Sequence, residues 1–183
     1  MKGLVIHEFG DINSHHVEEF DDPVAGPDDV IIDVHAIGLN FPDTLMLRGK
    51  YQMWPDRPFI PGRDAAGIVS SLGANVTTVK IGDRVSCQVL WGAFAEKVKA
   101  PETKVFKIPD ALDFITAAGM VTTYNTAYVA VYERGNIQHG ETVLITGASG
   151  GVGMAMVELA KARGAIVIAG VTSKEKGQIG VCY

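Results

Sequence analysis

A glycine-rich loop in the last third of the chain holds the residues best suited to chemistry. In "ASGGVG", Gly150 and Gly153 fill the second and third glycine places of the G-x-G-x-x-G pattern, and Ala148 stands at the first. Gly150 allows the backbone to approach a pyrophosphate, and Gly153 allows a helix to pack closely on a strand. Gly151 and Val152 lie where the helix is expected to begin, and N–H groups at a helix N-terminus bind phosphate. We therefore predict that Gly150, Gly151, Val152 and Gly153 contact a dinucleotide.

The residues around this loop predict one strand–helix–strand unit, which favours dinucleotide binding over a plain turn. Strands are expected at Val143–Thr146 and Ala165–Val171, because both are nearly continuous apolar runs, typical of parallel strands covered on both faces. Apolar residues at helical spacing between them predict one buried stripe: Val152, Ala155, Met156, Leu159 and Ala160.

The residues after the second strand indicate which dinucleotide is bound. NAD-binding proteins usually carry Asp or Glu there to hold the ribose 2′-hydroxyl, whereas this chain has Thr172, Ser173 and Lys174. The hydroxyl of Ser173 and the ammonium of Lys174 could bind a 2′-phosphate, so we predict NADPH as the cofactor. The alternative is that Lys174 is an ordinary solvated lysine.

The first hundred residues predict a small barrel. Short apolar runs alternate with Gly- and Pro-containing turns, and the Gly-Asp pair within "TVKIGDRVSCQV" (78–89) predicts a hairpin. After Pro109 the pattern becomes helical and ends at Gly135, a common helix terminator.

Composition excludes several classes of protein. The net charge is −5 and the basic residues are scattered, which argues against nucleic-acid binding. The longest apolar runs fall well short of the roughly 20 residues that span a bilayer, and "MKGLVIHEFG" lacks the features of a signal peptide, so we expect no membrane contact and a cytoplasmic location. Cys87 and Cys182 are too few for a disulfide framework or a cysteine zinc site, and Cys87 is expected to be a small buried apolar residue.

Six motifs occur in an order that resembles the medium-chain dehydrogenases/reductases: "GLNFPD" (38–43), "PGRDAAGIV" (61–69), "GDRV" (82–85), "GAFAE" (92–96), "NTAY" (125–128) and "GASGGVG" (147–153). Within that family the chain resembles the zinc-free quinone oxidoreductase, or zeta-crystallin-like, branch. The resemblance implies a mixed β-barrel plus α/β fold. A GroES-like barrel (1–110) and linking helices (111–135) would precede an incomplete Rossmann domain (136–183). Family members continue well beyond this point and "GQIGVCY" departs from them, so we expect a truncated member.

The resemblance also implies a site without metal. Zinc members carry Cys at the position of Asn40, His-Glu at Arg63-Asp64 and Cys near Thr122, and the residues found here are poor zinc ligands. Asp43 is expected to cap a helix that starts at Thr44.

Three further residues receive roles from the resemblance. It places Asn40 near the nicotinamide and ribose, Thr126 against the nicotinamide, and Tyr51 in the substrate pocket, where a hydroxyl could donate a proton. The alternatives are a turn cap for Asn40, an ordinary helix residue for Thr126 and a covering loop aromatic for Tyr51.

Two classes of function follow from this sequence. The first is an NADPH-dependent reductase of small-molecule quinones or other α,β-unsaturated carbonyl compounds, with a 2-enoyl-thioester reductase as the alternative within the enzyme class. The second is a catalytically silent GroES-like fragment that acts as a binding or structural module. The resemblance implies that the full-length parent is a homodimer.

Overall fold

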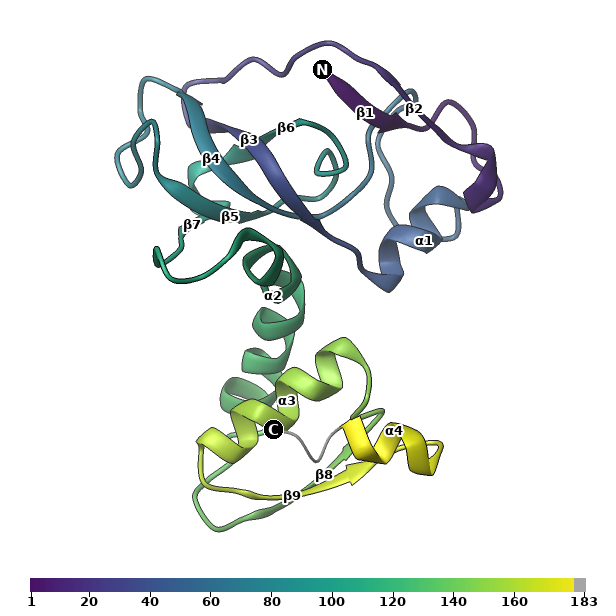
Figure 1. The fold of residues 1–183 in the computed structure, drawn as a ribbon, viewed down its shortest axis with the longest axis vertical. Coiled ribbons are helices and arrows are strands. Elements are labelled where there is room, and N and C mark those ends of the chain that lie inside the picture. Colours follow the sequence, from purple (N-terminus) through teal and green to yellow (C-terminus); the bar gives the residue numbers. More distant parts are fainter. Residues whose placement is uncertain (180–183) are drawn as a thin grey trace. The chain divides into compact units, whose positions relative to one another are not determined.

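The computed structural model describes residues 1–179 and divides into two compact units, residues 1–122 and 123–183 (Figure 1). The first unit is built mainly from antiparallel strands, and the second contains a parallel strand pair with helices. These secondary-structure elements confirm the predicted fold class, a mixed β-barrel plus α/β fold. The domain boundaries expected at residues 110 and 135 remain predictions, and the end of the "GQIGVCY" segment lies outside the described residues.

The first unit is centred on a five-stranded antiparallel sheet with the strand order β6-β3-β4-β5-β7 (Figure 1). Its strands are β3 (Asp29–Gly38), β4 (Asp64–Leu72), β5 (Arg84–Gln88), β6 (Lys97–Pro101) and β7 (Val105–Lys107). A separate antiparallel pair joins β1 (Lys2–Val5) to β2 (His16–Glu19). Two register shifts occur where β3 pairs with β4, and such bulges increase the twist of a sheet.

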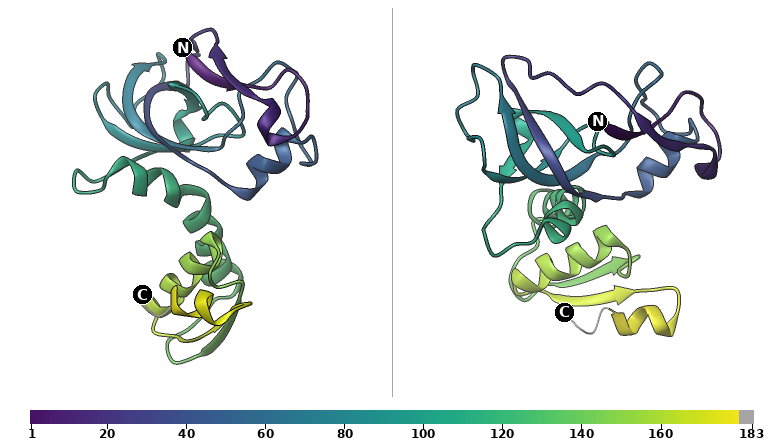
Figure 2. Two further views of the ribbon diagram at one scale, coloured as in Figure 1. Left: turned by 45° about the vertical axis from the view of Figure 1, so that its right-hand side comes forward. Right: turned by 45° about the horizontal axis from the view of Figure 1, so that its top comes forward.

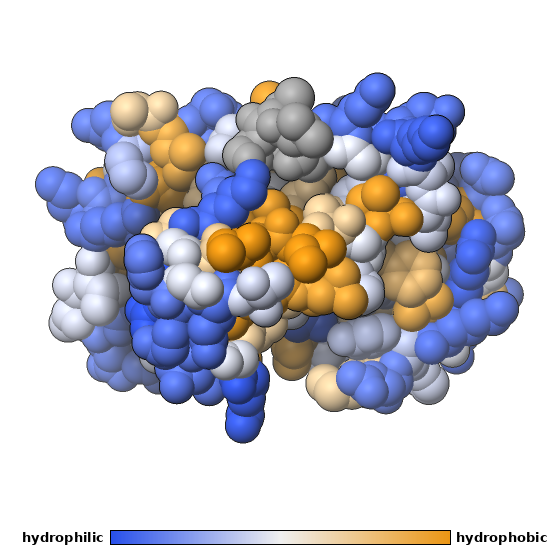
Figure 3. Space-filling model, turned by 90° about the horizontal axis from the view of Figure 1, so that it is seen from below, coloured by the Kyte–Doolittle hydropathy of each residue, from blue (hydrophilic) through white to orange (hydrophobic). Residues whose placement is uncertain are grey.

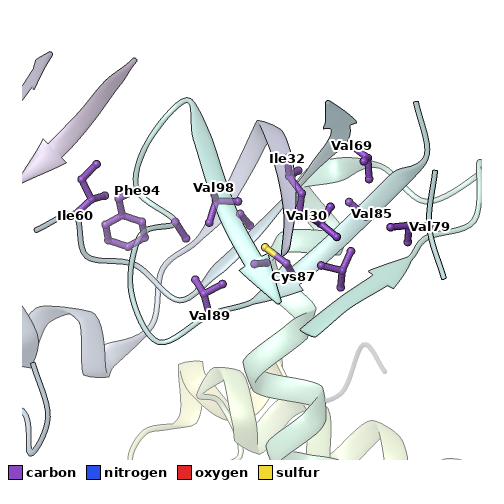
Figure 4. Packing of buried hydrophobic residues seen from close by; sticks show 14 of the residues in the cluster. Val30, Ile32, Ile60, Val69, Val79, Val85, Cys87, Val89, Phe94 and Val98 are labelled. Atoms are coloured by element: carbon purple, nitrogen blue, oxygen red, sulfur yellow. The ribbon is translucent and has the colours of Figure 1, made fainter. Parts of the chain in front are cut away.

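The core of this unit is filled by aliphatic side chains from neighbouring strands (Figure 4). Val30 and Ile32 of β3, Val69 of β4 and Val85 and Cys87 of β5 are all buried. Burial raises the pKa of the Cys87 thiol to about 12, so this side chain remains a neutral thiol at physiological pH. The prediction that Cys87 is a small buried apolar residue is confirmed.

The hairpin predicted for residues 78–89 is wrong. Only Arg84–Gln88 forms a strand in that segment, and its partners are β4 and β7. The turn instead packs on β4, where the Gly82 N–H donates to the Val69 carbonyl. Val79 is buried in the core from a loop, so its apolar character reflects burial and not strand pairing.

Two helices accompany the sheet, α1 (Phe41–Leu47) and the first part of α2 (Phe114–Tyr128). Gly38, at the end of β3, lets α2 approach the sheet, because a Cβ at this position would lie 2.4 Å from the carbonyl oxygen of Ala118. Helical structure continues through a π-helical segment, η3 (Val129–Arg134), as far as Gly135, in agreement with the pattern after Pro109.

The second unit contains the predicted strand–helix–strand unit. Strands β8 (Thr142–Thr146) and β9 (Ile166–Gly170) pair in parallel, joined by α3 (Gly151–Ala162). Helix α3 lies along the strand pair in both views of Figure 2, and short helix α4 (Lys174–Ile179) follows β9. The buried stripe is confirmed for Ala155 and Ala160, whereas Val152, Met156 and Leu159 are only partly buried.

The strand pair is covered on one face only within the described residues, not on both as expected. Leu144, Ile166 and Ile168 are 63%, 61% and 53% exposed, although all three are large and apolar. An apolar patch is visible in the view from below (Figure 3). Between residues 1 and 179, no helix is both long and apolar enough to cross a membrane.

Candidate active site

A buried carboxylate joins three distant parts of the first unit. Asp64 is the first residue of β4 and is only 1% exposed. The Asn40 Nδ2 donates a hydrogen bond to its Oδ2 over 2.9 Å, and the Thr122 hydroxyl donates to its Oδ1 over 2.7 Å. The Thr122 backbone N–H also donates to Oδ2, over 3.1 Å. Asp64 therefore holds the start of α1 and the middle of α2 against the end of the sheet.

Two further polar contacts extend this cluster. Gln88, the last residue of β5, donates from Nε2 to the Thr122 hydroxyl over 2.8 Å. Arg63, next to Asp64 in the chain, donates from Nη1 to the Tyr51 hydroxyl oxygen over 3.1 Å. Because a guanidinium can only donate, the Tyr51 oxygen must accept in this bond, and its own O–H remains able to donate elsewhere.

Asp43 does not cap a helix that begins at Thr44. Helix α1 begins three residues earlier, at Phe41, with Asn40 at the N-cap. Asp43 lies in the first turn, where its Oδ2 accepts the Asn40 N–H over 2.8 Å, so the carboxylate reaches back along the helix. Pro42 fits this first turn because its fixed φ is helical. The backbone of Asn40 therefore occupies the N-cap position, in line with the capping alternative. Its side chain instead donates to Asp64.

The carboxyl group of Asp43 is buried and unusually basic. Burial, together with repulsion from Asp64, raises its pKa from 3.8 to about 6, opposed by the Asn40 N–H and the charge of Arg63. Its Oδ1 has no hydrogen-bond partner among the described residues. Ionisation of this group is therefore costly in the folded state.

We expect Asp43→Asn to stabilise the protein near pH 8 by about 1–2 kcal/mol. The folded protein binds the proton of Asp43 more tightly than the unfolded chain, so stability falls as pH rises from about 4 to about 6. The amide removes this loss and keeps an oxygen for the Asn40 N–H. Urea unfolding at pH 4 and pH 8 measures the effect, which should disappear at pH 4. The exposed control Asp110→Asn should leave the free energy of unfolding unchanged at both pH values. An Asp43→Asn gain that is equal at pH 4 and pH 8 would contradict the raised pKa of Asp43.

The glycine loop of the second unit has the geometry of a phosphate site. Gly150 is the N-cap of α3 in an extended conformation, with no side chain capping the helix. A Cβ on Gly153 would lie 2.2 Å from the Gly147 carbonyl oxygen, so glycine is required there for packing. A Cβ on Gly150 would meet only that oxygen, at 3.4 Å, so the space above it is otherwise open. Gly151 and Val152 follow in the first turn, and these residues fit a bound pyrophosphate.

The residues predicted to bind the 2′-phosphate lie where β9 leads into α4. The Ser173 hydroxyl accepts the Lys176 N–H over 3.3 Å, so its oxygen caps α4 while its O–H can still donate. Lys174 is exposed, and the Lys176 ammonium donates to the Thr172 hydroxyl over 3.2 Å. The turn therefore contains two ammonium groups, of which the sequence identified only the first. Thr126 is exposed on α2.

Sequence reasoning missed the role of Arg63 and Gln88 in the site. In the sequence, Arg63 and Asp64 stand out only as replacements for zinc ligands, and no pattern marks Gln88. The "PGRDAAG" motif was the available signal, because it places a cation and a carboxylate side by side at the start of a strand. Within residues 1–179, no cluster of three or more His, Cys, Asp or Glu side chains could hold a metal ion.

Comparison with known proteins identifies a matching domain model and similar sequences. Residues 26–110 match the model of the alcohol dehydrogenase GroES-like domain. Quinone oxidoreductase-like protein 2 of Rattus norvegicus is 42% identical over 152 residues, which cover 82% of this chain and 43% of that protein. Quinone oxidoreductase of Homo sapiens is 39% identical over 157 residues, which cover 85% of this chain and 47% of that protein. Over most of its length, the chain is therefore similar to proteins named quinone oxidoreductase or quinone oxidoreductase-like.

A solved structure is similar to this chain as well. The crystal structure of Escherichia coli quinone oxidoreductase complexed with NADPH superposes with a TM-score of 0.93 at 31% identity, covering all of this chain and 56% of that one. The chain thus spans less than half the length of the two quinone oxidoreductase relatives.

Proposed function

We propose that the protein is an NADPH-dependent oxidoreductase that reduces quinones or other α,β-unsaturated carbonyl compounds without zinc. The observation that carries this proposal is the Arg63–Tyr51 hydrogen bond, because the Tyr51 oxygen accepts in it and the O–H stays able to donate. Bound NADPH would supply hydride. Tyr51 would donate a hydrogen bond or a proton to the oxygen of the acceptor, which becomes an alcohol or enol after reduction.

The cofactor contacts in this proposal are those expected from the sequence, with Lys176 added. The N–H groups at Gly150, Gly151, Val152 and Gly153 would hold the pyrophosphate, and Ser173 and Lys174, together with Lys176, would hold the 2′-phosphate. Asn40 and Thr126 would contact the nicotinamide end. Asn40 suits this role because Asp64 fixes its amide through the 2.9 Å hydrogen bond.

Independence from zinc is part of the proposal and rests on donor chemistry. Asn40 and Thr122 provide an amide and a hydroxyl, both hydrogen-bonded to Asp64, where zinc members carry thiolates. Arg63 adds a fixed positive charge beside them. We further propose a cytoplasmic location, a homodimeric parent protein and small-molecule acceptors as the only substrates.

The test measures quinone-dependent oxidation of NADPH by absorbance, with 9,10-phenanthrenequinone as acceptor. Tyr51→Phe should lower kcat by about 100-fold with little change in KM for NADPH, since it removes only the donated proton. A chelator should have no effect. Activity that requires added zinc, or a Tyr51→Phe variant as active as the parent, would refute the proposal. Binding of 2′,5′-ADP without any oxidation would favour the catalytically silent binding module.

Preference for NADPH over NADH is tested separately. Lys174→Ala and Lys176→Ala should each weaken NADPH binding by about fivefold to tenfold and leave NADH binding unchanged, because only NADPH carries the 2′-phosphate. Fluorescence titration measures both constants, and Lys161→Ala, on α3, serves as control. Equal losses for the two cofactors would contradict the assignment.

A further inference from the structure

The first unit has a pocket of about 380 Å³ that combines positive charge with apolar surface. Its lining residues are Arg63, Gln88, Val89, Leu90, Trp91, Lys99, Pro101 and Lys104. Three of these carry a positive charge and none is a carboxylate, in a chain whose net charge is −5. Small-molecule sites commonly have this size and this mixture of apolar walls with a few polar groups.

Arg63 offers an unused donor in this pocket. Its Nε is buried and has no hydrogen-bond partner among the described residues, while Nη1 is engaged with Tyr51. A buried donor without a partner is costly, so a ligand that accepts from it gains free energy. Nε and the second terminal nitrogen form a planar fork, which matches the two oxygens of a carboxylate.

The other liners complete a site for an amphiphilic anion. Lys99 on β6 and Lys104 just after it are exposed, and neither forms an ion pair within residues 1–179. Asp43 balances part of the Arg63 charge, since that charge lowers the pKa of Asp43, so the two lysines supply the remaining attraction for an anion. Trp91 and Leu90 offer apolar surface for a flat ring.

We infer that this pocket binds a small organic carboxylate with a flat apolar body. The carboxylate pairs with Arg63, the lysines attract it, and the ring packs against Trp91 and its apolar neighbours. This binding does not depend on the proposed reaction. Where the reaction also occurs, Arg63 links the pocket to the Tyr51 hydroxyl, so anionic acceptors would be selected over neutral ones of the same shape.

The experiment titrates the full chain with 2-naphthoate and with 2-naphthamide, which share the ring and differ in charge. The naphthoate should bind about tenfold more tightly at fixed ionic strength. Ring binding to the exposed apolar face of β8 and β9 would be equal for both probes and therefore cancels. Equal affinities would overturn the inference. Inorganic phosphate should compete poorly, and competition as strong as that of naphthoate would show a general anion site instead of a carboxylate site.

Variants locate the binding. Lys99→Met with Lys104→Met should weaken naphthoate about fivefold and leave naphthamide unchanged. The control, Lys50→Met with Lys80→Met, makes the same change in net charge at two exposed lysines outside the pocket. Arg63→Lys keeps the charge but loses the fork, and should weaken naphthoate about tenfold. A control pair that loses as much affinity as the pocket pair would contradict the site, and this comparison does not require the Arg63 variant to fold.

Discussion

Replacement of Asp64 by Ala is expected to destabilise the first unit by about 3–4 kcal/mol. Three donors lose their acceptor at once, namely the Asn40 side chain and the backbone and hydroxyl of Thr122. These groups lie around a carboxylate that is 1% exposed, so water cannot readily replace it. The loss should be larger than for any single donor, because Asp64 holds two helices and a strand together.

Urea unfolding measures this loss, and two variants make the interpretation specific. Asp64→Asn keeps one acceptor oxygen but turns an NH₂ group toward a donor, so an intermediate loss is expected. Asp110→Ala removes an exposed carboxylate and should change the unfolding free energy by less than about 0.5 kcal/mol. An Asp64→Ala variant as stable as the Asp110 control would show that the cluster does not organise the unit. Thr122→Val, which removes only the hydroxyl, should cost about 1–2 kcal/mol.

Local patterns predicted most of the fold, because strand and helix formation depend on neighbouring residues. The strand–helix–strand unit was recognisable from apolar runs on either side of a glycine loop. The hairpin prediction for 78–89 is wrong because a local pattern does not distinguish the two causes of an apolar residue. Val79 is equally compatible with a strand and with a buried loop. Only tertiary contacts decide between them.

The site was harder to predict than the fold. Asn40 and Tyr51 came from a family resemblance, whereas the partners that orient them lie 24 and 12 residues away in the chain. The pairing of Thr122 with Asp64 depends in addition on the approach of α2 to the sheet, which Gly38 permits through close backbone contact. Sequence spacing does not encode that approach. Lys176 contacts Thr172, four residues earlier, because α4 begins at Lys174, shortly after β9 ends at Gly170.

The stability of the second unit should respond differently to the same substitution at two glycines of the nucleotide loop. Gly153→Ala is expected to destabilise the second unit by about 3 kcal/mol, because its Cβ would lie 2.2 Å from the Gly147 oxygen and 2.8 Å from the Ala148 Cα, both backbone atoms. Gly150→Ala should leave stability unchanged within about 0.5 kcal/mol, since its φ of −86° suits alanine and its Cβ contact of 3.4 Å is ordinary.

Binding and stability measured together should separate the two variants. Hydrogen exchange across residues 142–170 would report the stability of the unit, and fluorescence titration would report NADPH affinity. Gly150→Ala should weaken NADPH about tenfold with normal protection of the β8 and β9 amides, because its methyl group fills the space proposed for the pyrophosphate. Gly153→Ala should lose protection and binding together. If Gly150→Ala binds NADPH as well as the parent does, the open space above the helix N-terminus is not where the cofactor lies, since that substitution changes the space and leaves the fold intact.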